Sequence, residues 1–139
     1  MNKRYLQIGA LLGSVSVILG AFAAHGLKKI LTPEELTVFE TGVRYQFYHV
    51  FAMLAAAMLS EWFHPSRCRW AARFFLTGII LFSGSLYLMS FAKAKHWEQL
   101  TSLGWITPVG GLFLIVGWLM LLVAIGAPTN KVSSGKAGW

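Results

Sequence analysis

The chain has 139 residues, of which 56% are hydrophobic and only 12% are charged. A soluble domain usually carries about a quarter charged residues, so we predict an integral membrane protein of one domain. The net charge of +7 does not indicate nucleic-acid binding, because the basic residues lie between apolar runs and not along a soluble face with interleaved aromatic residues.

Four apolar segments follow one another, at about residues 5–27, 45–63, 70–92 and 103–127. Each is close to the ~20 residues that an α-helix needs to cross the hydrocarbon core of a bilayer. Backbone polar groups cannot stay unpaired in lipid, so helices are expected. The prediction is an all-α integral membrane four-helix up-down bundle over residues 1–127, with a flexible polar tail over 128–139.

The first segment allows two interpretations. Lys3, Arg4, the apolar run and the Ala-x-Ala pattern at 21–23 fit a cleaved secretory signal. The run is long for a signal, however, and small residues recur at a 4-3-4-3 spacing that places them on one helix face: Gly9, Gly13, Ser16, Gly20 and Ala23. Small residues let helix backbones approach closely in lipid. We therefore expect this segment to be retained as a packing helix.

The second helix is predicted to begin near residue 33, before its apolar segment. Thr32, Pro33 and Glu35 form the pattern of a capping box with proline at the first helical position. The first turns are polar enough to lie partly in the headgroup region. Glu40 and Arg44 stand one turn apart, which suits an ion pair at the interface.

The basic residues predict an orientation. Seven lie near the termini and the second connection, at 3–4, 67–73 and 131–136, and four lie on the opposite side, at 28–29 and 93–95. Lysine and arginine near the ends of spans favour the cytoplasmic side. Both termini are therefore expected in the cytoplasm.

Polar residues gather in the half of the predicted bundle away from the termini. This polar set consists of His25, Tyr45, Gln46, His49, Ser83, Ser85, Tyr87 and Thr107. Polar side chains in lipid need partners, so we expect the set to face the bundle interior. It is either a small pocket open to the outer side or interhelical hydrogen bonding that fixes the packing, and the second interpretation is favoured. Gly84, Gly110 and Gly111 are expected to add close helix packing.

Sequence motifs for chemistry are absent. The four histidines show no i,i+4 ligand spacing, and His25 and His49 have no evident nucleophile or orienting carboxylate. Cys68 is the only cysteine. We expect no metal site, no cofactor and no enzyme activity; the alternative is an enzyme that modifies a lipid or a quinone.

Four ordered motifs resemble a known family. GAFAAHGL, YQFYH, FSGSLY and TPVGG occur in this order across the four segments. Over about residues 5–126 the chain resembles the domain-of-unknown-function 423 family, also called uncharacterised protein family 0382, to which animal transmembrane protein 256 is related. The signature residues map to Gly20, Ala21, Phe22, His25, Gly26, Tyr45, Gln46, His49, Ser83, Gly84, Ser85, Tyr87, Thr107, Pro108, Gly110 and Gly111. The resemblance implies a four-helix multi-pass protein of bacterial inner membranes, and it implies no activity.

Two functional hypotheses follow. The first is a non-enzymatic packing or accessory subunit whose partners are membrane lipids and either further copies of itself or a larger membrane complex, with no nucleic acid. The alternative is a small transporter or channel subunit that acts as an oligomer and uses the outer-side polar set.

Overall fold

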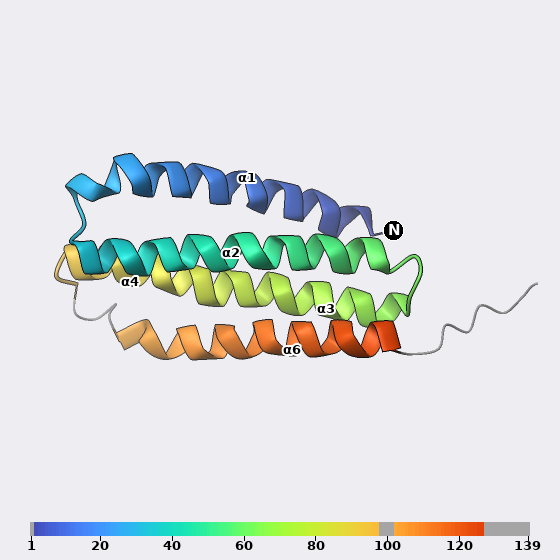
Figure 1. Ribbon diagram of the computed structural model, residues 1–139. Helices are drawn as coiled ribbons and strands as arrows, with labels where there is room; N and C mark the ends of the chain where they lie inside the picture. The colour runs from blue at the N-terminus through green and yellow to red at the C-terminus, as the bar shows by residue number, and fades with distance from the viewer. Residues whose placement is uncertain (1, 98–101, 127–139) are drawn as a thin grey trace, which may run out of the picture.

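The computed structural model of the protein describes residues 2–97 and 102–126. Within those ranges all regular structure is helical. Four long helical rods lie alongside one another in the order α1, α2, α3–α4 and α6, each antiparallel to the one before it (Figure 1). The predicted all-α four-helix up-down bundle is therefore confirmed, while the tail predicted at 128–139 lies outside the described residues.

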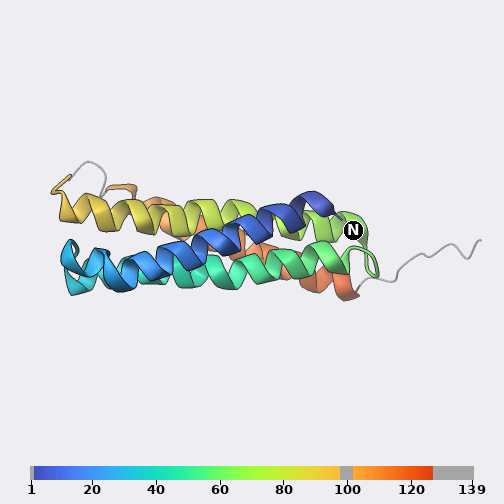
Figure 2. The same cartoon turned by 90° about the horizontal axis from the view of Figure 1, so that it is seen from above.

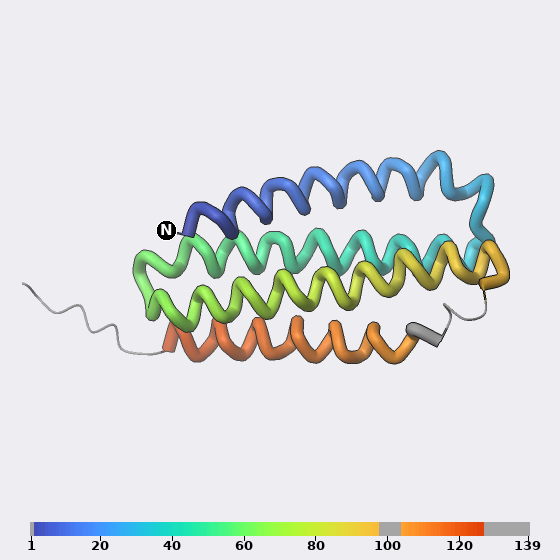
Figure 3. The backbone as a smooth tube through the Cα atoms, turned by 180° about the vertical axis from the view of Figure 1, so that it is seen from behind, coloured from blue at the N-terminus to red at the C-terminus, as the bar shows by residue number. Residues whose placement is uncertain are grey.

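The third rod contains an irregularity that the sequence analysis did not predict. Its parts α3, η2 and α4 form one continuous helix (Figure 3), and η2 is a π-helical turn in its middle. In chain order the elements are α1 Lys3–His25, η1 Leu27–Lys29, α2 Pro33–Leu59, α3 Pro65–Gly78, η2 Ile79–Ser83, α4 Gly84–Ala94, η3 Ser102–Trp105 and α6 Ile106–Gly126. A π-helical turn inside an α-helix is rare and often lies at a functional position.

Helix α2 begins with a complete capping box. The Thr32 hydroxyl accepts from the Glu35 amide at 3.3 Å, and the Glu35 carboxylate accepts from the Thr32 amide at 2.8 Å. Pro33 occupies the first helical position, where its missing N–H costs no hydrogen bond. These residues fix the start of α2 well before its apolar part.

Three helical segments are long and apolar enough to cross a membrane: Lys3–Lys29, Pro65–Ala94 and Ile106–Gly126. Four such spans were predicted from the sequence. Helix α2 has the length, with 27 residues, but not the composition, because it carries Glu40, Arg44, Gln46 and His49 among its apolar residues. Since α2 packs against α1, α3 and α4, two of these, Gln46 and His49, are buried within the bundle.

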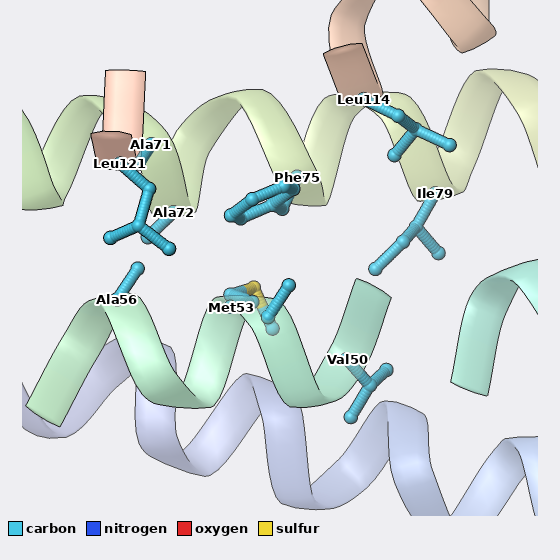
Figure 4. Close-up of a cluster of buried hydrophobic side chains, with 10 residues drawn as sticks. Val50, Met53, Ala56, Ala71, Ala72, Phe75, Ile79, Leu114 and Leu121 are labelled. Atoms are coloured by element: carbon cyan, nitrogen blue, oxygen red, sulfur yellow. The ribbon is translucent and has the colours of Figure 1, made fainter. Parts of the chain in front are cut away.

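The main core lies between α2, α3 and α6. Met53 and Ala56 of α2 face Phe75 and its neighbours on α3, whereas Val50 lies on the side of α2 toward α1 (Figure 4). The complete cluster is Val50, Ala52, Met53, Ala56, Ala71, Ala72, Phe75, Ile79, Leu114 and Leu121. Helix α1 lies outside this core and runs obliquely over α2 (Figure 2); a second, smaller cluster of Ala23, Leu27, Leu31 and Phe39 holds its far end.

Glycines allow α6 to approach the third rod very closely. A Cβ added to Gly110 would lie 2.4 Å from the backbone N of Phe82, in η2. A Cβ on Gly78 would lie 2.4 Å from Leu114, and one on Gly117 would lie 2.7 Å from Phe75. At Gly110 the obstacle is backbone, which cannot rotate away. The contact between α6 and the π-helical turn therefore requires glycine.

Candidate functional site

Gln46, on α2, links three helices. Its Nε2 donates to the Leu12 carbonyl oxygen of α1 at 3.0 Å, and its Oε1 accepts from the Tyr87 hydroxyl of α4 at 2.9 Å. Gln46 is only 4% exposed, and a buried amide is tolerated where both its donor and its acceptor end are satisfied. This hydrogen-bonded chain therefore ties α1 and α4 to α2.

A second polar pair joins α4 to α6. The Ser85 and Thr107 hydroxyl oxygens lie 2.7 Å apart, and Ser85 Oγ also donates to the Phe82 carbonyl oxygen at 2.8 Å. A serine hydroxyl has one hydrogen. Either hydroxyl can donate in the pair, because Ser85 also has the Phe82 carbonyl as an acceptor and Thr107 Oγ1 also lies 3.8 Å from the acceptor Met89 Sδ. The start of α6 is thus fixed to the residues that follow η2.

His49 belongs neither to the hydrogen-bonded chain of Gln46 nor to the Ser85–Thr107 pair, and it lies among aromatic rings. Its Nδ1 lies 2.7 Å from the Tyr45 carbonyl oxygen; because a carbonyl only accepts, Nδ1 carries the hydrogen. The His49 ring stacks on Tyr45 at 5.9 Å and lies 6.0 Å from Phe75 and 6.2 Å from Trp118, between ring centroids. The histidine is 7% exposed, so it contributes to the contact of α2 with α3 and α6.

The remaining members of the polar set, apart from the contact of Tyr45 with His49, do not join these contacts. His25 is exposed at the end of α1, where its Nδ1 donates to the Ala21 carbonyl oxygen at 3.1 Å. Tyr45 is 40% exposed and packs on the Phe82 ring at 4.7 Å. Ser83, on η2, is buried, and its Oγ has no hydrogen-bond partner in the described chain. The structure thus divides the predicted set into separate interhelical contacts and brings no single pocket together.

The small residues of α1 face α2. A Cβ on Gly9 would lie 2.5 Å from Leu54 Cδ2, whereas one on Gly13 or Gly20 would lie 3.6 Å from Val50 or Val43, respectively. Ser16 is buried in the same row, and its hydroxyl donates to the Leu12 carbonyl oxygen at 2.9 Å. This row therefore packs on α2 inside the protein, although two of its members, Ser16 and Gly20, also line an open groove between the two helices.

The three later glycines that were predicted to pack differ from one another. Gly110 makes the close backbone contact with η2, and a Cβ on Gly111 would make an ordinary contact with the Phe82 ring at 3.7 Å. A Cβ on Gly84 would meet nothing within 4 Å. The structure therefore shows open space, and no close packing, at the Cβ position of Gly84.

Glu40 and Arg44 line an open groove between α1 and α2. The groove has a volume of about 370 Å³ and is lined by Ser16, Val17, Gly20, Glu40, Val43, Arg44, Phe47 and Tyr48. Val17 is 63% exposed and Tyr48 is 56% exposed, so the groove opens on the outer face of the bundle. Both charged side chains are described, and they form no ion pair with each other in the structure; the predicted pairing stays a prediction.

The packing role of Gly78 and Gly117 and the π-helical turn were not predicted from the sequence. Gly110 and Gly117 lie seven residues apart and so on one helix face, which is a signal that could have been found. Nothing in the residue types of Ile79–Ser83 indicates a π-helical turn. The described residues contain no group of three His, Cys, Asp or Glu side chains able to hold a metal ion. The free Cys68 is buried.

Comparisons with known proteins agree with this architecture. Residues 19–111 match the family described as "Protein of unknown function (DUF423)". The chain is 43% identical to the UPF0382 membrane protein of Haemophilus influenzae, over 87% of this chain and 92% of that protein. It is 38% identical to the UPF0382 membrane protein SAB0533 of Staphylococcus aureus, over 88% and 94% of the two chains. It is 36% identical to the UPF0382 inner membrane protein YgdD of Escherichia coli, over 88% of this chain and 90% of that protein.

No solved structure matches the chain. The family match covers more than half of the sequence, and the identities extend over most of the relatives' lengths. The helices that carry the four sequence motifs are those that form the bundle. The chain therefore belongs to the DUF423 (UPF0382) family of membrane proteins.

Proposed function

We propose that this protein is a non-enzymatic packing or accessory subunit of the bacterial inner membrane, with both termini in the cytoplasm, and that it associates with a second copy of itself through the groove between α1 and α2. The inner-membrane name of the relative YgdD and the distribution of the basic residues support the location and the orientation. The groove that holds Glu40 and Arg44 is the observation that carries the proposed association.

The groove lies within the depth of the bilayer. Helix α1 has 23 residues, about 35 Å at 1.5 Å per residue, which is close to the ~30 Å of the hydrocarbon core. Gly20 and Ser16 precede the end of α1 at His25 by five and nine residues, so the groove lies about 8–14 Å below that end. A charged side chain at such a depth is unfavourable by a few kcal/mol unless it is paired.

A second copy at the same depth provides the missing partners. The groove holds one acid and one base, so it is self-complementary in charge, as a two-fold symmetric interface requires. Helical side chains lean toward the helix N-terminus, so Arg44 leans toward the level of Glu40. Two copies related by a two-fold axis along the membrane normal pair Arg44 of each with Glu40 of the other.

The hydrogen bonds inside the bundle favour packing over transport. Gln46 is satisfied by Leu12 and Tyr87, and Ser85 is satisfied by Thr107 and Phe82. These groups join helices to one another and do not line a continuous polar path. They support the packing hypothesis more than the transporter or channel alternative.

Charge reversal tests the proposed association. Glu40→Lys makes the groove doubly basic and Arg44→Glu makes it doubly acidic. When differently tagged copies are co-expressed and captured from mild detergent, wild type should retain wild type. Each variant should retain its own kind about tenfold less, because like charges that meet in an interface cost more than 1.4 kcal/mol. The two variants should retain each other.

The mutual capture of the two variants separates association from an ion pair within one chain, since an internal pair is broken in both. Glu34→Lys, at an exposed position in the first turn of α2 outside the groove, is the matched control and should associate like wild type. If both groove variants retained their own kind as wild type does, the proposed interface would be wrong. A cross-linking experiment gives a second test. The variant Val17→Cys, made in a Cys68→Ser background with Glu40 and Arg44 unchanged, should form a disulfide between two copies in membranes. Absence of that disulfide would also show that the proposed interface is wrong.

A further inference from the structure

A second groove lies at the opposite end of the bundle, where α1 begins and α2 passes into α3. It has a volume of about 540 Å³ and is lined by Asn2, Lys3, Arg4, Ser60, Pro65 and Arg69. Three of these residues are basic, and no acid is among the described lining residues. The start of the chain and the start of α3 thus bring positive charge together across more than 60 residues of sequence.

The basic residues at this end fall into two groups. Arg67 donates to the Val123 carbonyl oxygen of α6 at 3.3 Å, and Arg73 donates to the Tyr5 hydroxyl at 3.3 Å while lying 4.8 Å over the Trp70 ring. The three that line the groove, Lys3, Arg4 and Arg69, form no hydrogen bond or ion pair with the described residues. Arg67 and Arg73 are thus satisfied by the protein, whereas the basic residues of the groove remain available for an external anion.

The start of α3 adds to this positive potential. Pro65 lines the groove as the first residue of the helix, and the N-cap residue His64 makes no side-chain capping hydrogen bond. The first amides of α3 are therefore not capped by that side chain, and the positive end of the helix dipole lies at the groove. The helix dipole favours an anion at this position, and the three cations, which have no partner among the described residues, favour the same ligand.

The position of the groove relative to the bilayer indicates which anion it can bind. Two of the three apolar spans, Lys3–Lys29 and Pro65–Ala94, have their first residues here, so the groove lies at the edge of the hydrocarbon core, where phospholipid phosphates lie. Basic pockets between transmembrane helices are known to bind acidic lipid headgroups. We infer that this groove binds a phosphate anion held by Lys3, Arg4 and Arg69, and that the phosphate belongs to the headgroup of an anionic phospholipid.

Lipid retention by the full chain tests this inference. Protein extracted from vesicles that contain equal parts of phosphatidylcholine and phosphatidylglycerol is measured by native mass spectrometry. Wild type should retain phosphatidylglycerol in preference to phosphatidylcholine. Arg69→Gln should lower that preference about fivefold. The double change Lys3→Gln with Arg4→Gln should lower it further, because each basic residue near an anionic surface contributes a similar share of the binding free energy.

Arg73→Gln is the matched control. It removes the same charge from the same helix and the same end of the bundle, but from a residue with protein partners. Its lipid preference should equal that of wild type even if its thermal stability falls. If Arg69→Gln retained phosphatidylglycerol as wild type does, or if Arg73→Gln lost as much as Arg69→Gln, the groove would not be the binding site.

A competition arm identifies the source of the phosphate. Inorganic phosphate at millimolar concentration should leave the retained phosphatidylglycerol unchanged, because it lacks the acyl chains that hold the lipid at this depth. Displacement of the lipid by inorganic phosphate would overturn the assignment to a lipid headgroup and assign the groove to a free phosphate. The result does not depend on whether the protein forms the dimer proposed above, since the two grooves lie at different levels of the bundle.

Discussion

At the interface of α1 with α2, a Cβ added to Gly13 or Gly20 would lie 3.6 Å from a valine side chain, whereas at the interface of α6 with η2 a Cβ on Gly110 would lie 2.4 Å from the backbone N of Phe82. The first distance is an ordinary contact and the second is an impossible one. Both interfaces contain glycines at regular spacing, but only at the second is the obstacle backbone; at the first, the one close approach is at Gly9, where an added Cβ would meet the Leu54 side chain at 2.5 Å. Regular spacing shows that small residues share a face, and it does not show how closely the opposite helix approaches.

The side of the bundle formed by α1 is also less buried than the third rod. In its most apolar window, the span that contains α1 buries 17% of its residues, whereas the span Pro65–Ala94 buries 39%. Helix α1 lies at the edge of the bundle and leaves the groove with Glu40 and Arg44 open. The third rod lies between α2 and α6. The tightly packed part is therefore the α2–α3–α6 core, and the α1 side has room for a partner.

The largest expected effect is at the tight interface. Gly110→Ala should lower the free energy of unfolding in detergent by about 2–3 kcal/mol, the upper part of the range for overpacking, because the new Cβ meets backbone. Thermal unfolding measures this effect. Gly84→Ala is the control, since its Cβ would meet nothing within 4 Å. Equal stability of the two variants would mean that the α6 contact is not a tight one.

The next largest effect is expected at Gln46, whose hydrogen bonds join α1 and α4 to α2. Gln46→Leu should destabilise the protein by about 1–2 kcal/mol, because it leaves the half-buried Tyr87 hydroxyl without its partner. Tyr87→Phe should cost less, and the double variant should cost less than the sum. A double-mutant cycle by thermal unfolding measures the coupling. Strict additivity would show that the two side chains do not interact.

A smaller effect is expected where α4 meets α6. Thr107→Val removes the hydroxyl that pairs with Ser85 and keeps the side-chain shape. The expected loss is about 0.6 kcal/mol, the average for interhelical hydrogen bonds in a membrane protein. Ser14→Ala is a suitable control, because the Ser14 hydroxyl only bonds within its own helix. If Thr107→Val lowered the free energy of unfolding no more than the control does, the Ser85–Thr107 pair would contribute no net stabilisation.

The smallest effect is expected on α1. Gly13→Ala should be neutral or stabilising by up to about 1 kcal/mol, because alanine is the better helix former and its Cβ would only reach ordinary contact with Val50. Thermal unfolding next to Gly110→Ala gives the direct comparison. A loss at Gly13 as large as at Gly110 would show that α1 packs as tightly as α6 does, and the distinction between the two interfaces would fail.

The sequence by itself determined the class of structure. A low charged fraction and four apolar segments allow few solutions in lipid, since the backbone must satisfy its own hydrogen bonds. The capping box at Thr32 depends on residues within one turn, so local sequence predicts it. The inward position of Gln46 and His49 follows from helical periodicity and the cost of polar groups in lipid. Such properties need only local or composition-level information.

Only the tertiary structure decided how the polar and small residues are used. Gln46 bonds to a Leu12 carbonyl, which no side-chain pattern marks, and His49 lies among rings from three helices. The π-helical turn at η2 and the need for glycine at Gly110 arise where two backbones meet. The availability of Lys3, Arg4 and Arg69, in contrast to Arg67 and Arg73, depends on which partners lie nearby. Each of these depends on distances between segments far apart in the chain, which helix periodicity alone does not specify.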